Sequence, residues 1–123
     1  MSFFNTFFMI KLKHTVVNLT IPSGDSVDDA TLKLEEGNVV ACALFKNNDP
    51  SSNVNVKIEA SNSDELHPFV SYQEYQPTNG NHFDSRKRLY FSGGREIRIF
   101  AKSNTPLTDE FTFQMIFYID QSK

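Results

Sequence analysis

The side chains of this 123-residue sequence that could do chemistry are few and scattered. Its histidines are His14, His67 and His82, and its one cysteine is Cys42. Their spacing lacks the close pairs that bind zinc, and a single cysteine cannot complete a Cys/His cluster. No Gly-x-Ser-x-Gly turn presents a nucleophilic serine either. We therefore expect no enzyme, no metal site and no cofactor.

An acidic segment holds Asp25, Asp28 and Asp29, whose carboxylates are the oxygen ligands that calcium prefers. The segment lacks the Asp-x-Asp-x-Asp-Gly spacing of a calcium loop. Acidic residues are also common in solvated turns, and we expect such a turn here.

Aromatic side chains, amides and turn formers are combined between residues 72 and 84. Long loops in small domains often carry function, and tyrosine and asparagine make adaptable contacts with a receptor or a glycan. The candidate ligand residues are Tyr72, Tyr75, Asn79, Asn81 and His82. The alternative is that the rings of this loop pack onto the end of the domain.

Five of the twelve basic residues gather around one predicted hairpin, at positions 86, 87, 88, 95 and 98. One interpretation is that they protect an edge strand, because charge on an edge prevents unwanted pairing. The other is an electrostatic contact with the acidic segment 25–36 of another copy. In that second interpretation the subunit-contact residues include Arg86, Lys87 and Arg88.

The first eight residues hold a third of the twelve phenylalanines, namely Phe3, Phe4, Phe7 and Phe8. Exposed rings favour aggregation, so we expect this arm, residues 1–8, to be covered by its own domain or to act as a subunit contact. A third alternative is that Met9 is the natural translation start and that the preceding residues are disordered. Residues 9–123 are expected to form one domain.

Alternating apolar and polar residues predict the strands that must position these side chains. The predicted strands span residues 8–13, 15–21, 30–35, 39–46, 54–61, 69–75, 87–91, 96–102 and 110–119. Short strands with loops between them predict an all-β fold, an antiparallel two-sheet β-sandwich of about eight strands, with either a jelly-roll or an immunoglobulin-like strand order. The predicted core includes Val56, Ile58, Ile97, Ile99, Phe113, Met115 and Phe117.

Local signals add detail to this fold. The apolar face changes parity between Ile10 and Val17, which predicts a bulge or break near His14. The run 39–46 is apolar on both faces and is therefore expected at the centre of a sheet. The best candidate for a helical turn is 26–32.

Two glycine-containing turns predict hairpins. Gly37 and Asn38 would pair the strands on either side of them, and a three-residue loop at 92–94 would set Leu89 opposite Ile97.

The overall composition restricts the partners. A net charge of −3 and a pI near 5.5 lack the basic excess that phosphate binding needs, so we expect no nucleic-acid partner. The single cysteine excludes an intrachain disulfide and favours a reducing compartment. The apolar start is too short to span a membrane.

The apolar arm, about eight strands, turns such as Glu35-Glu36-Gly37-Asn38 and long polar loops resemble the small β-sandwich virion proteins of bacteriophages, of penton, spike-base or head-decoration type. The resemblance implies a non-enzymatic structural subunit that forms homo-oligomers or binds other virion proteins through terminal arms. It also implies a place in the virion, which is assembled in the host cytoplasm. The alternative function is a carbohydrate- or receptor-binding β-sandwich module.

Deletion of residues 1–8 tests the arm. If the arm docks on a neighbour, the deletion should weaken self-association, measured by sedimentation velocity, while the β circular dichroism and the thermal midpoint stay nearly intact. Four rings that each remove about 100 Å² of apolar area from water are worth several kcal/mol at about 25 cal/mol per Å². A large drop in the midpoint with normal association would instead place the arm on its own sandwich, and no change in either property would show that the arm is dispensable.

Overall fold

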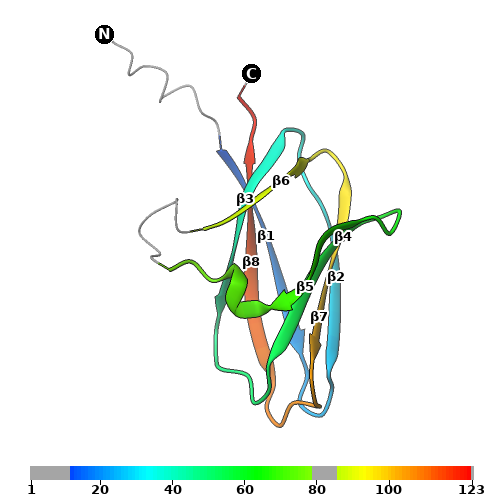
Figure 1. The fold of residues 1–123 in the computed structure, drawn as a ribbon, viewed down its shortest axis with the longest axis vertical. Coiled ribbons are helices and arrows are strands. Elements are labelled where there is room, and N and C mark those ends of the chain that lie inside the picture. The colour runs from blue at the N-terminus through cyan, green and yellow to red at the C-terminus, as the bar shows by residue number, and fades with distance from the viewer. Residues whose placement is uncertain (1–11, 79–85, 123) are drawn as a thin grey trace.

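The computed structural model describes residues 12–78 and 86–122, and in these residues the chain forms two β-sheets packed face to face (Figure 1). The described elements are β1 (Leu12–Ile21), β2 (Val27–Lys33), β3 (Asn38–Lys46), β4 (Val54–Ala60), β5 (Glu65–Ser71), the 3₁₀ helix η1 (Tyr72–Tyr75), β6 (Lys87–Ser92), β7 (Glu96–Ser103) and β8 (Phe111–Asp120). The predicted all-β, antiparallel two-sheet sandwich is confirmed.

Strands far apart in the sequence pair with each other. The first sheet has the order β1-β8-β3-β6 and the second sheet has the order β2-β7-β4-β5, with every pairing antiparallel. The first strand thus pairs with the last, the second with the seventh, the third with the sixth and the fourth with the fifth. The chain thus resembles one long hairpin that is folded over itself, and its paired strands pass together from one sheet to the other.

The core lies between the sheets and follows the two-residue period of the strands. All seven predicted core residues are fully buried, which confirms the parity of β4, β7 and β8. Strand β3 lies between β8 and β6, as its apolar faces predict, and Ala41 and Cys42 on its two faces are both fully buried. The sandwich is therefore set by which face of each strand is apolar.

Both predicted hairpins are wrong, because the strands on either side of each turn belong to different sheets. The turns are instead bound to each other: the Gly93 amide donates to the Gly37 carbonyl at 2.7 Å and the Gly94 amide donates to the Glu35 carbonyl at 2.8 Å. Gly37 has φ +136°, and a Cβ there would lie 2.6 Å from the carbonyl oxygen of Asp120. Glycine is therefore needed for a close crossing of chains, not for a hairpin.

The predicted bulge near His14 is also wrong. Strand β1 pairs with β8 without a register shift from Leu12 to Ile21, and the change of parity leaves Leu12 on the outer face, 39% exposed. The register shift in the first sheet lies in β3 instead, between Val39 and Ala41. A single exposed leucine costs less than interrupting a ten-residue ladder.

The helical turn is not in 26–32, which contains most of strand β2, but in η1. The predicted strand 69–75 ends at Ser71, whose hydroxyl accepts a hydrogen bond from the Gln73 amide and caps the turn. Tyr72 and Tyr75 are three residues apart, a spacing that places both rings on one side of a 3₁₀ helix, where both are buried.

Truncation of Phe117 to alanine should lower the free energy of unfolding by about 3–5 kcal/mol, because the ring is fully buried between the sheets. The matched control is Gln114→Ala on the outer face of the same strand, which should change it by less than about 0.5 kcal/mol. Urea denaturation of both variants measures the difference. Equal small changes would show that the inner face of β8 is misassigned.

Candidate functional site

The outer face of the second sheet carries a row of aromatic and charged side chains that crosses all four strands. Phe69 comes from β5, Lys57 from β4, Phe100 from β7 and Asp29 from β2. The register sets Lys57 opposite Phe100, and Phe100 opposite Asp29. We call these four residues, together with Arg98, the cation–aromatic row.

Cations in this row lie over rings and are also paired with carboxylates. The Lys57 ammonium lies 5.2 Å from the ring centroid of Phe69 and 5.5 Å from that of Phe100. The Arg98 guanidinium lies 4.5 Å from the Phe100 centroid and 2.8 Å from a carboxylate oxygen of Asp29. Each such contact at an exposed site contributes only about 0.5–1 kcal/mol, so the row holds its side chains in place more than it stabilises the fold.

Two hollows flank Phe69 on this face. One has a volume of about 280 Å³, and its lining residues are Val27, Asp28, Asp29, Phe69, Phe100, Ala101 and Lys102. The other, of about 390 Å³, adds polar groups such as Asn104. Val27 is 57% exposed and Phe69 is 43% exposed, so the face offers apolar area beside compensated charges. This combination suits contact with another protein surface.

The sequence pattern does not by itself predict this face as a site. A signal for it exists, because Phe100 falls on the otherwise polar face of its strand, between Arg98 and Lys102. An aromatic residue on the solvent side of a strand is a candidate for binding.

The basic residues predicted to act together are divided among different contacts. Arg98 pairs with Asp29 of its own chain, so this member of the acidic segment is engaged within the chain. Arg95 donates to the carbonyl and the hydroxyl of Ser92. These two guanidiniums are therefore held by the sandwich itself.

The three predicted subunit-contact residues lie at or next to edge strand β6. Arg86 donates to the hydroxyl of Tyr118 at 3.0 Å, and Lys87 lies 3.8 Å from the carboxylate of Glu74. Arg88 is exposed on β6. Their position fits protection of an edge. A contact of these residues with another subunit stays a prediction, as does the role of Phe3, Phe4, Phe7 and Phe8, which lie outside the described residues.

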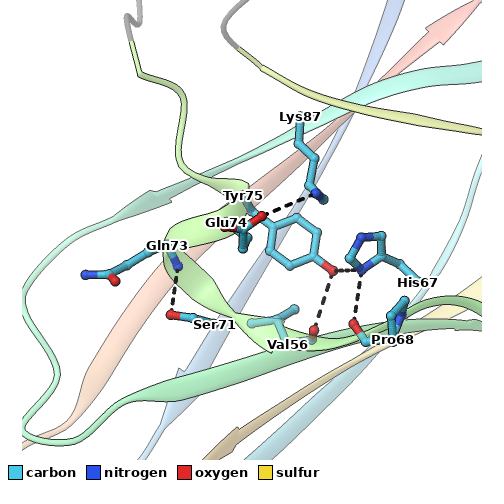
Figure 2. A network of polar contacts seen from close by, with 8 residues as sticks. All are labelled: Val56, His67, Pro68, Ser71, Gln73, Glu74, Tyr75 and Lys87. Carbon is cyan, nitrogen blue, oxygen red and sulfur yellow. Dashed lines mark hydrogen bonds and ion pairs between the residues drawn. The ribbon is translucent and has the colours of Figure 1, made fainter.

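The predicted ligand loop begins in the core. Tyr75 is fully buried and its hydroxyl lies 2.8 Å from Nδ1 of His67 and 3.4 Å from the carbonyl of Val56, as Figure 2 shows. Nδ1 of His67 also lies 3.0 Å from the carbonyl of Pro68. In the tautomer that carries a hydrogen on Nδ1, this hydrogen is shared between the Pro68 carbonyl and the oxygen of the Tyr75 hydroxyl, and the hydroxyl donates to the Val56 carbonyl.

Tyr72 is also buried, with its ring 5.5 Å from that of Phe111. Both tyrosines therefore match the alternative in which the rings pack onto the sandwich. Asn79, Asn81 and His82 lie outside the described residues, and glycan or receptor binding by them stays a prediction.

Burial changes the acidity of two groups in this region. Burial raises the pKa of the Cys42 thiol to about 12, although the Lys87 ammonium acts in the opposite direction. Burial, followed by the charges of Cys42 and Glu74, raises the pKa of Tyr75 as well. Both groups are neutral at physiological pH, which suits packing and not nucleophilic attack.

In the parts of the chain that the structure describes, no three His, Cys, Asp or Glu side chains are grouped so that they could hold a metal ion. The described residues also contain no helix long and apolar enough to cross a membrane.

Alkaline pH should destabilise the protein partly through Cys42. The folded state keeps the thiol protonated above its ordinary pKa of 9.0, whereas the unfolded chain releases the proton. Stability is therefore retained below about pH 9 and falls above it by up to about 1.4 kcal/mol per pH unit from this group. In Cys42→Ala the fall measured by urea denaturation between about pH 9 and pH 10.5 should be shallower. Val56→Ala, a core truncation without a titrating group, should keep the wild-type slope, and identical slopes in all three proteins would contradict the prediction.

Comparison with known proteins gives similarity at the level of the fold. No protein-family model matches this sequence. No curated protein matches it. Among solved structures, the fold is similar to a chain of the cyanophage Pam1 capsid asymmetric unit, with a TM-score of 0.51, 16% identity, and coverage of 90% of this chain and 85% of that chain.

Two further structures have lower scores. One is the Yersinia pseudotuberculosis-derived mitogen, with a TM-score of 0.43, 10% identity, and coverage of 90% of this chain and 89% of that chain. The other is the acidic stable capsid of Helicobacter pylori bacteriophage KHP30, with a TM-score of 0.39, 10% identity, and coverage of 89% of this chain and 93% of that chain. These two scores are too low to support an argument. The Pam1 similarity shows a shared fold that extends over nearly the whole chain.

Proposed function

We propose that this protein is a non-enzymatic structural subunit of a phage-like virion and that it acts by assembling with other subunits. The observation that carries the proposal is the similarity of the sandwich fold to a phage capsid chain, a similarity that covers 90% of this chain. A fold is shared by many functions, so the proposal also depends on the surfaces of this particular chain.

The strand order favours the jelly-roll class over the immunoglobulin-like class. In an immunoglobulin sandwich several neighbouring strands of the chain pair within one sheet. Among the described strands of this chain, β4 and β5 are the one consecutive pair that lies in the same sheet. Every other connection between consecutive described strands passes from one sheet to the other. Pairing of first with last and second with seventh is what two interlocked Greek keys produce, as in viral capsid and lectin domains.

The polar side chains support a role in contact more than in reaction. The Tyr75 hydroxyl, the Arg86 guanidinium and the Arg98 guanidinium are each engaged by a group of the same chain. The outer face of the second sheet, in contrast, leaves Val27 and Phe69 exposed beside paired charges. An apolar centre with a polar surround is the usual composition of a protein interface.

Within this proposal the partners are further copies of the chain or other virion proteins, and the place of the protein is the virion, assembled in the host cytoplasm. A penton, spike-base or decoration role would each fit a small sandwich that presents one contact face.

Particles purified from the native source by density-gradient centrifugation test the function. The protein should be recovered with the particle fraction at a fixed ratio to the other components, measured by quantitative mass spectrometry. Recovery only as a free 14.1 kDa chain that joins no complex would overturn the proposal.

Substitution Phe69→Glu should abolish incorporation into particles formed by co-expression with the other virion components. The change buries a charge in any contact over the cation–aromatic row. It should lower the free energy of unfolding by only about 1–2 kcal/mol, because Phe69 is 43% exposed and loses one cation–ring contact, so the variant stays folded. The comparison variant is Tyr90→Glu, which is 69% exposed on β6 of the first sheet, beside the predicted contact residue Arg88. Normal incorporation of this variant would locate the contact on the second sheet and not on β6. Equal incorporation of both variants would remove the second sheet from the contact.

A further inference from the structure

Of the four edge strands formed by the described residues, three carry features that discourage pairing with another strand. Strand β5 contains Pro68, and its pairing with β4 is interrupted by two register shifts. Strand β6 carries Lys87 and Arg88 and has a register shift against β3. Strand β2 carries Asp28 and Asp29. Prolines, bulges and charges are the usual protection of sheet edges.

Strand β1 has none of these features beyond Lys13 and His14 near its start. It spans ten residues, contains no proline, and pairs with β8 without a shift along its whole length. Val16, at its middle, is 47% exposed on the outer face. A long, regular and partly apolar edge is a ready site for pairing with another strand.

The direction of the backbone groups of β1 follows from two hydrogen bonds. The Thr20 amide donates to the Asp28 carboxylate at 3.0 Å, so it points away from β8. Thr112, the partner of Thr20 on β8, directs its carbonyl to the Asn47 amide and its amide to the Asn48 side chain, on the side of β3. The Thr20–Thr112 pair is therefore a non-hydrogen-bonded pair of the ladder.

Alternate residues of an antiparallel strand share this orientation, so His14, Val16 and Asn18 also direct their amides and carbonyls outward. The Thr20 amide is paired with Asp28, but the outward amides and carbonyls of His14, Val16 and Asn18 have no hydrogen-bond partner among the described residues. The edge of β1 is thus open at its centre.

We propose that β1 pairs antiparallel with β1 of a second copy across a two-fold axis, which joins the two first sheets into one continuous sheet. The residues of β1 whose backbone groups face outward have even numbers, so each even-numbered residue pairs with an even-numbered residue of the second copy. Pairing centred on Val16 sets Val16 opposite Val16 of the partner subunit. The overlap then runs from residue 12 to residue 20.

The side chains favour this register. His14 lies opposite Asn18 of the partner subunit, and Lys13 lies opposite Leu19 of the partner subunit, so no like charges face each other. The two exposed valines cover each other on the outer face. A second copy therefore supplies both the missing backbone partners and the apolar contact. The role of this contact in a particle rests on the proposed function.

A cysteine at the axis gives a direct test. Hydrogen-bonded partners in an antiparallel pair have Cα atoms about 5.5 Å apart, within the range of roughly 4.4–6.8 Å that a disulfide spans. Val16→Cys should form a covalent dimer under mild oxidation, assayed by non-reducing electrophoresis. The native Cys42 is buried and should give no background dimer.

Two controls separate the proposed register from random collision. Val27→Cys places a thiol at a 57% exposed site on the other sheet, and His14→Cys places the two thiols about four residues apart along the paired strands, or roughly 13 Å. Both should cross-link far more slowly than Val16→Cys. Equal rates for all three variants would overturn the proposal.

A backbone test uses Val16→Pro, which removes the outward amide but no hydrogen bond to β8, and which an edge strand tolerates. Sedimentation equilibrium should show loss of the dimer in Val16→Pro and its retention in Val16→Thr, which keeps the amide. If Val16→Pro does not fold, Val16→Lys places like charges at the axis and should have the same effect. A wild-type protein that stays monomeric at every concentration would overturn the proposal.

The outcomes also separate this contact from the proposed function. If the protein enters particles but Val16→Cys forms no cross-link, the virion role is supported and the β1 contact is excluded. If Val16→Cys cross-links but the protein is never recovered in particles, the β1 contact is supported and the virion role is excluded.

Discussion

The rest of the structure depends on strand β8. It is the last strand of the chain, yet it lies inside the first sheet, where it pairs with β1 on one side and β3 on the other. Its inward residues Phe111, Phe113 and Phe117 are fully buried. The first sheet and the core between the sheets are both incomplete until this last strand is in place. The fold is therefore built from contacts between distant parts of the sequence. Such topologies fold slowly compared with helical proteins of the same size.

Charged and polar groups occupy places where a neighbour compensates them. Lys57 lies over two rings and 3.1 Å from the carboxylate of Glu59, and Arg86 lies over the ring of Tyr118 while it donates to the hydroxyl. Among the described residues, no buried side-chain nitrogen or oxygen lacks a hydrogen-bond partner. Among the described residues, the edge of β1 has backbone groups without a protein partner, and the outer face of the second sheet has exposed apolar area. Another protein could cover both.

The sequence predicts the faces of the strands well because burial imposes a two-residue period on residues such as Val56, Ile99 and Met115. It does not predict the connections, because a glycine turn at Gly37 reports a local backbone conformation and not the sheet that the next strand joins. The alternation in 69–75 predicts a strand that includes Tyr72 and Tyr75, whereas their spacing of three residues is that of the 3₁₀ turn that they form. The sequence does not predict the outer face of the second sheet either, because its residues lie on four strands that only the strand pairing brings together.

The pairing of Leu12 with Asp120 means that β1 begins and β8 ends at the same end of the sandwich. A mechanical force that separated these two points would open the ladder between β1 and β8 one pair at a time, starting at that end. A force that pulled β1 and β8 in opposite directions along their length would instead load many hydrogen bonds at once. The sandwich therefore resists a load along its strands better than a load that separates the start of β1 from the end of β8.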